Sequence, residues 1–310
     1  MKEMTLEEVK IYVLEHFCEY LPECYQKSTL RVESVVKNNQ RLTGISLAGV
    51  KISPTIYLEN IYEEYLEHKS SLCQILRKKA NLFYERMKNG EEIMTLLKKV
   101  KTMSKEEIGK HLFLAIVQTK NNHALLEHCI HRKFLDLSVL CNYEFSVGKE
   151  LLSIGLSKML LDQIQLSEEE AFELAYKNSC TKGMLQEAEV FRTMAMLRKK
   201  VDSDFPIPRV HLAYSLQKEY GANIMLNQGF LKMASDRLGG NYYVMPISRW
   251  EVMLISGAID QTTEEKIRLN KIMKDVTVMG YDPEVIVSDH AYFYISSIPG
   301  QQSGIMAVAF

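Results

Sequence analysis

The sequence has few of the features that mark a specialised class of protein. No stretch approaches about 18 consecutive apolar residues, so we expect no membrane-spanning helix. The N-terminal segment lacks the basic start, apolar centre and small-residue cleavage site of a secretory signal. Neither charge dominates, because 38 lysines and arginines oppose 39 aspartates and glutamates. That balance removes the global electrostatic argument for a protein that binds nucleic acid or a membrane surface.

Cysteine pairs and enzyme motifs are also missing. The six cysteines show no CxxC spacing, which is the pattern of redox and zinc-binding pairs. We expect them to be reduced and mostly buried thiols, which is typical of a cytoplasmic protein. The chain has no GxSxG elbow, no phosphate-binding Walker loop, no GxGxxG and no HExxH. We therefore predict no cofactor, and no motif assigns a reaction.

What is present is the composition of a globular protein, with 46% hydrophobic and 25% charged residues in 310 positions. A chain of this length needs no disulfide or metal to fold, and ordinary domain sizes favour two lobes. The turn and proline content of residues 200–209 places a linker there. We predict an N-terminal α+β lobe over 1–200, a C-terminal lobe over 210–296, and a loosely held tail over 297–310.

Hydrophobic periodicity assigns elements to the N-terminal lobe. Thr5 and Glu8 form a capping box for a first helix, which Pro22 stops. Alternating residues predict a hairpin over 30–47 and an edge strand over 52–58. The other expected elements are a long helix capped by Ser70 or Ser71 and ended by Asn89-Gly90, short helices over 91–110, core strands over 112–117 and 134–145, a helix or loop over 121–131, and a helix over 168–178 capped by Ser167 and Glu170.

The C-terminal lobe shows the order β-α-β-β-α-β. This order places helices on one face of a mixed or antiparallel sheet, so the predicted fold class is α+β. The expected elements are a strand over 222–226, a helix over 228–238, strands over 242–247 and 251–256, a helix over 262–278 and a strand over 285–295.

The densest group of possible metal ligands is His123, His128, Cys129 and His131. Imidazole and thiolate bind zinc or iron at neutral pH. The spacing matches no known metal motif, and adjacent residues on a helix point about 100° apart, so His128 and Cys129 would not chelate one ion together. We predict solvent-facing imidazoles that lead into a buried strand, and no metal site.

Four residues are candidates for acid–base chemistry: His131, Asp136, Asp289 and His290. Asp136 interrupts an apolar run, so it is either the outward face of a half-buried strand or a carboxylate base in a cleft. Ser288, Asp289 and His290 are the residue types of a hydrolase triad, but neighbours on a strand point to opposite faces. We interpret Ser288-Asp289 as a turn or strand entry. A hydrolase or metal-dependent enzyme that uses His131 and Asp136, with Asp289 and His290 beside them, is the alternative function.

Tyrosines are candidates for a recognition surface, because tyrosine combines apolar area with a polar hydroxyl. The residues concerned are Tyr57, Tyr62, Tyr65, Tyr292 and Tyr294. At these spacings the competing interpretation is packing at the edge of the core. We keep Tyr57, Tyr62, Tyr292 and Tyr294 as candidate binding residues.

Local charge is less even than the total. Residues 69–110 hold eleven lysines and arginines against five glutamates, and a second basic group follows at 198–200. Phosphate contacts need such clustering on one side of a protein. Exposed helices commonly carry solvated charges of this kind, and no nucleic-acid-binding motif accompanies them. Association with nucleic acid is therefore a second alternative function.

Several short stretches follow one another in a recognisable order: Pro54–Leu58 with Tyr62 and Tyr65, His131 with Phe134–Leu137, Tyr220–Ala222, Tyr243–Pro246, and Val287–His290 with Tyr292 and Tyr294. They resemble an uncharacterised domain-of-unknown-function family of anaerobic Gram-positive gut bacteria, over about residues 30 to 296. The sequence departs from that family at Ser248–Glu251, where it has Trp250 in place of a His-Glu pair. The resemblance implies an intracellular α+β protein and supplies no activity, substrate or cofactor.

These observations favour a binding or regulatory protein of the cytoplasm without catalytic activity. The expected partner is another protein, and no membrane association is expected.

Overall fold

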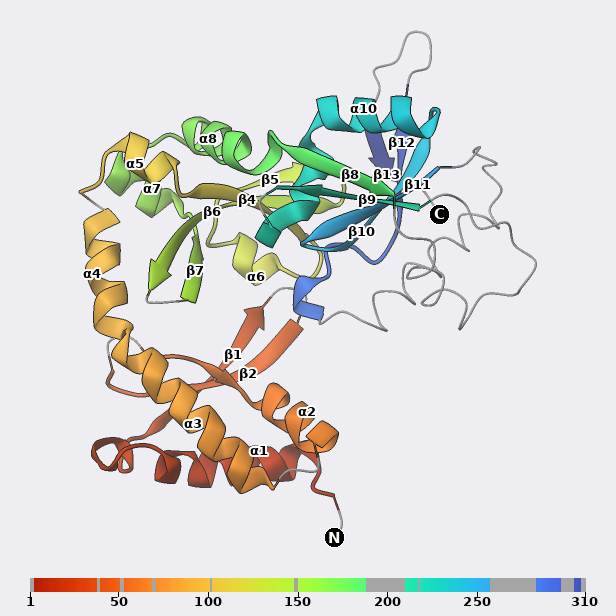
Figure 1. The fold of residues 1–310 in the computed structure, drawn as a ribbon. Helices are drawn as coiled ribbons and strands as arrows, with labels where there is room; N and C mark the ends of the chain where they lie inside the picture. The colour runs from red at the N-terminus through yellow and green to blue at the C-terminus, as the bar shows by residue number, and fades with distance from the viewer. Residues whose placement is uncertain are drawn as a thin grey trace. The chain divides into compact units, whose positions relative to one another are not determined.

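The structure is a computed structural model of the 310-residue chain (Figure 1). It describes residues 3–37, 40–50, 53–68, 71–100, 102–147, 150–187, 210–216, 218–256, 283–296 and 304–307. Within these residues, helices accompany three β-sheets, which confirms the predicted α+β class. None of the helices described is both long and apolar enough to cross a membrane.

The chain divides into two compact units. Unit 1 comprises Met1–Lys37, Arg41–Met103 and Ser146–Leu152, and unit 2 comprises Asn38–Gln40, Ser104–Phe145 and Ser153–Phe310. These units do not coincide with the two lobes expected from the sequence, because one sheet of unit 2 takes strands from both sides of residue 200. The linker expected at 200–209 lies outside the described residues.

Unit 1 contains a small sheet in the order β1-β2-β3 and the helices around it. The predicted capping box begins the first helix, since the Thr5 hydroxyl accepts from the Glu8 N–H and the Glu8 carboxylate accepts from the Thr5 N–H. The expected edge strand is shorter than 52–58. The elements are α1 (Leu6–His16), η1 (Phe17–Tyr20), η2 (Glu23–Tyr25), β1 (Leu30–Lys37), β2 (Gln40–Leu47), β3 (Ile56–Tyr57), α2 (Leu58–His68), α3 (Leu72–Lys88) and α4 (Gly90–Val100).

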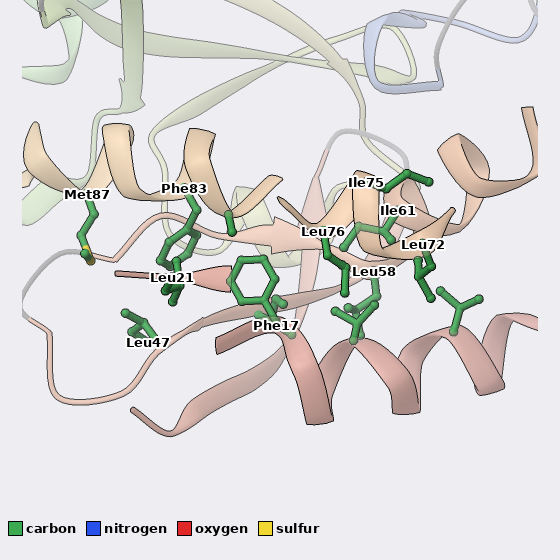
Figure 2. Packing of buried hydrophobic residues seen from close by; sticks show 14 residues of the cluster. Phe17, Leu21, Leu47, Leu58, Ile61, Leu72, Ile75, Leu76, Phe83 and Met87 are labelled. Atoms are coloured by element: carbon green, nitrogen blue, oxygen red, sulfur yellow. The ribbon is translucent and has the colours of Figure 1, made fainter. Parts of the chain in front are cut away.

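The core of unit 1 confirms the hydrophobic stripe of the long helix (Figure 2). On α3, the residues of that stripe are all buried, and they pack with buried residues of α1, η1 and α2. The rings of Phe17 and Phe83 meet edge to face with centroids 5.6 Å apart. The stripe consists of Leu72, Ile75, Leu76, Phe83 and Met87.

The first sheet of unit 2 has the strand order β4-β6-β5, and β7 also pairs with β6. Helix α8 begins at the predicted capping box of Ser167 and Glu170 and packs on β4. The elements are α5 (Lys105–Gly109), β4 (Leu112–Gln118), α6 (His123–Leu126), β5 (His131–Phe134), β6 (Leu137–Val147), β7 (Glu150–Gly155), α7 (Lys158–Ile164) and α8 (Glu168–Cys180).

The second sheet of unit 2 has the order β13-β12-β10-β11-β9-β8, with antiparallel neighbours throughout. The elements of this region are β8 (Gly183–Glu187), β9 (Val210–Ser215), η3 (Lys218–Leu226), α10 (Gln228–Leu238), β10 (Tyr242–Ser248), β11 (Glu251–Ser256), η4 (Pro283–Val285), β12 (Tyr292–Ile295) and β13 (Gly304–Ala307).

Several expected elements of this region differ from the structure. Residues 222–226 belong to the helical turns of η3, because a short buried apolar run is compatible with either a strand or a helix. The strand expected over 285–295 is restricted to β12. Residues 304–307, expected in a loose tail, form β13 at the edge of the sheet. The helix expected over 262–278 lies outside the described residues.

Candidate functional site

Asp136 lies at the tip of a β-hairpin and not within a single strand. The sequence predicts one strand over 134–145, whereas Phe134 pairs with Leu137 and the chain reverses at Leu135 and Asp136. Leu135 has a φ of 59°, which is a left-handed conformation. Turns of this kind commonly contain glycine or asparagine, and this one contains neither. The reversal places the Asp136 side chain at the surface, where 48% of it is exposed.

The residues before β12 bring a second set of polar groups to Asp136. Ser288 is 1% exposed, and its hydroxyl donates to the backbone oxygen of His290 at 3.1 Å and lies 3.2 Å from the Tyr292 hydroxyl. This buried anchor fixes the turn that presents Asp289 and His290. Tyr292 is fully buried, and its hydroxyl donates to Asp136 Oδ1 at 2.8 Å.

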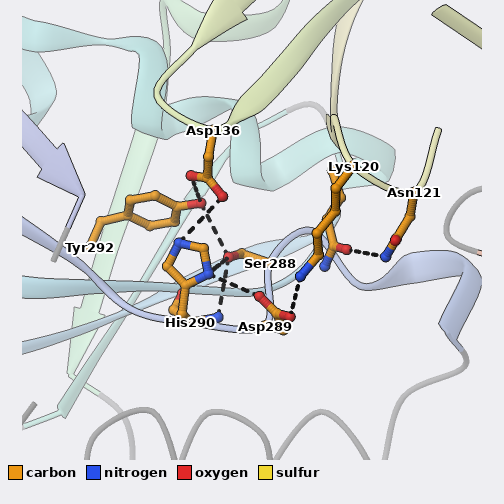
Figure 3. A network of polar contacts seen from close by, with 8 residues as sticks. Lys120, Asn121, Asp136, Ser288, Asp289, His290 and Tyr292 are labelled. Carbon is orange, nitrogen blue, oxygen red and sulfur yellow. Dashed lines mark hydrogen bonds and ion pairs between the residues drawn. The ribbon is translucent and has the colours of Figure 1, made fainter. Parts of the chain in front are cut away.

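His290 joins two carboxylates (Figure 3). Its Nε2 lies 3.4 Å from Asp136 Oδ2, and its Nδ1 lies 2.9 Å from Asp289 Oδ1. Lys120 extends the chain of contacts by donating from Nζ to Asp289 Oδ2 at 2.7 Å. We call this set the polar network; it consists of Lys120, Asp136, Ser288, Asp289, His290 and Tyr292.

Electrostatics within the polar network favour the ionised form of Asp289. Burial opposes ionisation of Asp289, but hydrogen bonds from Lys120 and His290 outweigh it and hold the pKa of Asp289 below its usual value. Burial raises the pKa of Tyr292, and the charge of Asp136 adds to that rise. The Tyr292 hydroxyl therefore remains a hydrogen-bond donor across the physiological pH range.

The geometry of the polar network is that of a cross-link. A general base needs a ring nitrogen directed at its substrate, whereas both nitrogens of His290 face carboxylates. A nucleophilic serine must reach its substrate, whereas Ser288 is buried and already bonded to the backbone. The contacts join the β5–β6 hairpin, the residues after β4 and the residues before β12.

The structure separates His131 from the other three acid–base candidates. His131 is exposed at the start of β5, opposite Leu140, and its Nδ1 lies 3.0 Å from the backbone oxygen of Cys129. Asp136 follows the other end of the same strand. Asp136, Asp289 and His290 thus converge, whereas the pairing of His131 with Asp136 that the enzyme alternative requires does not occur.

The histidine-rich segment shows no arrangement for a metal. His123, His128 and His131 are exposed, and Cys129 is half-buried, which raises the pKa of its thiol. No group of three His, Cys, Asp or Glu side chains able to hold a metal occurs in the part of the chain that the structure describes.

The candidate tyrosines lie in different settings. Tyr62 is half-buried in unit 1, where it stacks with Tyr65 at a centroid distance of 6.5 Å, and Tyr57 is also half-buried there. Tyr292 and Tyr294 are fully buried in unit 2, and Tyr294 stacks on Tyr242 at 4.8 Å. Tyr292 and Tyr294 therefore present no ring to a partner at the surface.

Carboxylates neutralise part of the basic segment over 69–110. Lys78 and Lys79 both pair with Glu64, and Lys105 pairs with Glu170. The segment also divides between the two units after residue 103. The ion pairs weaken the case for a phosphate-binding face.

A cavity that no sequence motif indicates lies in unit 2, between α8 and the β4-β6-β5 sheet. Its volume is about 380 Å³, within the range of about 300–1,000 Å³ typical of ligand pockets. We call it the α8 cavity. Its lining is mostly apolar, with charged groups among it, and consists of Leu114, Arg132, Lys133, Phe134, Val139, Phe172, Glu173, Tyr176, Lys177 and Leu226.

Buried hydrogen bonds hold the floor of the α8 cavity in place. β4 is an edge strand, so its outward backbone groups need partners from other elements. The Leu114 N–H donates to Ser179 Oγ of α8 at 2.8 Å, and the Leu114 oxygen accepts from Asn223 Nδ2 of η3 at 2.6 Å. Both side chains are buried, so three of the elements that line the cavity, β4, α8 and η3, are tied together at one residue.

Sequence signals for this cavity existed but were local and weak. Phe172 and Tyr176 are one helical turn apart and share a face of α8. Arg132 and Phe134 are two residues apart on β5 and share a face of the sheet. Neither pair shows that α8 and β5 lie together, because that contact depends on the tertiary fold.

A second cavity of about 390 Å³ is more polar. Asn178 and Ser179 line it, but their side chains already bond to the backbone at Gly109, Leu112 and Leu114. Because these two side chains already form hydrogen bonds within the protein, this cavity offers fewer polar groups for binding a ligand.

Comparison with known proteins gives one match. A family model described as a family of unknown function, DUF5688, matches residues 6–296. No curated protein and no solved structure matches the chain. Because the match covers nearly the whole sequence, the chain belongs to the family of unknown function DUF5688.

Proposed function

We propose that this protein is a binding protein without catalytic activity, and that the α8 cavity holds a small ligand with an apolar body. The observation that carries the proposal is a cavity of about 380 Å³ whose apolar lining is fixed by buried hydrogen bonds at Leu114. A preformed cavity favours binding, because little conformational entropy is lost when the ligand enters.

The polar network supports the absence of catalysis. Its histidine has both nitrogens occupied by carboxylates, and its serine is buried. Catalysis that uses His131 together with Asp136 also lacks support, because the two residues lie at opposite ends of β5.

A cytoplasmic location, a bacterial origin and a regulatory role toward another protein are parts of the same proposal. The location is supported by six free cysteines, of which Cys141 and Cys180 are buried, since thiols persist in a reducing compartment. The bacterial origin follows the sequence resemblance. Ligand binding in the α8 cavity would be the signal that such a regulatory protein transmits.

The test uses a neutral apolar fluorophore, N-phenyl-1-naphthylamine, whose emission rises when it leaves water. We expect saturable binding by the full chain. Leu226→Trp fills the cavity from its η3 side and should raise the dissociation constant of the fluorophore at least about tenfold. Met233→Trp, on the exposed face of α10, introduces the same side chain away from the cavity and should bind as the wild type does.

Thermal unfolding of both variants establishes that each is folded at the temperature of the titration. The proposal fails if the wild type shows no saturable binding, or if the two tryptophan variants lose affinity equally.

A further inference from the structure

We infer that the ligand of the α8 cavity carries a carboxylate and that Arg132 binds it. This inference rests on the proposed binding function and specifies its chemical class. Three cationic side chains line the cavity, Arg132, Lys133 and Lys177, against one carboxylate, Glu173. An apolar cavity with an excess of positive charge is complementary to a molecule with an apolar body and one negative group.

Arg132 is held in a position suited to this contact. Its guanidinium carbon lies 4.2 Å from the centre of the Phe172 ring, and both residues line the cavity. Stacking on an aromatic ring orients the guanidinium plane at the apolar wall. The planar fork of an arginine matches the two oxygens of a carboxylate and can bind them with two parallel hydrogen bonds.

The existing partner of Arg132 is one that a ligand can replace. Arg132 Nη2 lies 3.0 Å from Glu169 Oε1, and the Glu169 side chain is 80% exposed. An ion pair with so exposed a carboxylate contributes little to stability, at most about 1 kcal/mol. The guanidinium also has five N–H donors, so some remain for a ligand while Glu169 is bound.

The two lysines add positive charge to the lining of the cavity. Within the residues that the structure describes, no carboxylate lies within 4.0 Å of the Nζ atom of Lys133 or Lys177. Glu173 contributes one opposing charge at the same wall. The lining therefore suits a singly charged carboxylate, whereas Glu173 disfavours a ligand with two negative charges.

The test compares two molecules of nearly equal shape, 1-naphthylacetic acid and its neutral amide, 1-naphthylacetamide. Each is titrated against the full chain loaded with N-phenyl-1-naphthylamine, and displacement of the fluorophore gives its affinity. We expect the wild type to bind the acid at least about fivefold more tightly than the amide. Arg132→Met keeps an apolar stem over Phe172 and should remove this preference, so that the variant binds the acid and the amide with equal affinity.

Two further variants complete the design. Arg237→Met removes an arginine from the exposed face of α10 and should keep the full preference for the acid. Glu173→Gln removes the opposing charge and should raise the ratio of acid to amide affinity two- to threefold.

The outcomes separate this inference from the proposed function. If the fluorophore does not bind, the binding function itself fails. If the fluorophore binds but the wild type does not distinguish acid from amide, or Arg132→Met keeps the preference, the carboxylate inference is wrong and the apolar cavity stands. Tighter binding of 1-naphthyl phosphate than of the acid would also overturn the assignment to a singly charged carboxylate.

Discussion

The polar network and the α8 cavity share the β5–β6 hairpin but use their charges in opposite ways. In the network, Asp136, Asp289 and His290 each face another protein group at 3.4 Å or less. At the cavity, the carboxylate that pairs with Arg132 is exposed, and Lys133 and Lys177 have no carboxylate within 4.0 Å among the described residues. A dense cluster of chemical groups in a sequence can thus serve structure, and the binding site that we propose lies where the described residues leave charge uncompensated.

We therefore expect substitutions in the polar network and substitutions at the α8 cavity to affect different properties of the protein. Changes in the network should lower stability without altering binding in the cavity, and changes at the charged wall of the cavity should alter binding at little cost in stability. Substitutions under the cavity floor should affect both.

The largest effect is expected for Asn223→Ala, beneath the cavity floor. Asn223 is 1% exposed and donates to the Leu114 oxygen, so its removal leaves a buried acceptor unpaired. The free energy of unfolding should fall by about 1–3 kcal/mol. Urea denaturation measures this loss, and titration with N-phenyl-1-naphthylamine should show weaker binding as the floor shifts.

Asn81→Ala is the matched control for this change. Asn81 is exposed on α3 and makes no side-chain hydrogen bond among the contacts described, and alanine is the better helix former, so the variant should be at least as stable as the wild type. Equal stability of the two asparagine variants would show that Asn223 does not support the floor.

The next prediction concerns Tyr292 and Tyr294, two fully buried tyrosines of β12 that are separated by one residue. Tyr292→Phe removes a hydroxyl that donates to Asp136 and contacts Ser288, and should lower the free energy of unfolding by about 1–2 kcal/mol. The hydroxyl of Tyr294 has no hydrogen-bond partner among the described residues, so Tyr294→Phe should leave stability unchanged or raise it. Thermal and urea unfolding measure both, and neither variant should change the affinity for the fluorophore.

Local sequence patterns predicted much of the fold correctly. The capping boxes at Thr5 and Ser167 and the stripe from Leu72 to Met87 each depend on residues three or four apart, and the structure confirms all three. The hairpin at Leu135 was missed, because its residues carry no glycine or asparagine and the pairing of the strands imposes the positive φ.

Within the polar network, only the contact between residues that are adjacent in the chain was predictable from the sequence. Asp289 and His290 are neighbours in the chain, so their contact follows from sequence alone. Tyr292 and Asp136 are 156 positions apart, and the two bonds at Leu114 come from residues 65 and 109 positions away. Contacts at such separations depend on the tertiary fold, which local patterns in a single sequence do not specify.

A smaller effect concerns acid stability. The pKa of Asp289 is held below its usual value of 3.8 by Lys120 and His290, against the effect of burial. A carboxylate with a lowered pKa contributes stability that is fully present above the unfolded value and is lost as pH falls through the folded value. The wild type should therefore exceed Asp289→Asn in unfolding free energy above about pH 5, and this advantage should disappear below the folded pKa.

The advantage should be no more than about 1 kcal/mol, because 40% of the Asp289 side chain is exposed and solvent screens its partners. Urea unfolding of both proteins between pH 7 and the lowest pH at which each stays folded measures it. A difference that is independent of pH, or that grows in acid, would contradict the assigned role of the Asp289 carboxylate.

The smallest effect on stability is expected for Arg132→Met, which decides whether the comparison holds. Its ion pair with Glu169 is exposed, and the methionine keeps an apolar contact with Phe172, so unfolding should change by no more than about 0.5 kcal/mol. The same variant should lose the preference for a carboxylate ligand. If Arg132→Met instead destabilises the protein as much as Tyr292→Phe does, the guanidinium is a structural group like those of the network, and the cavity has no charge reserved for a ligand at that position.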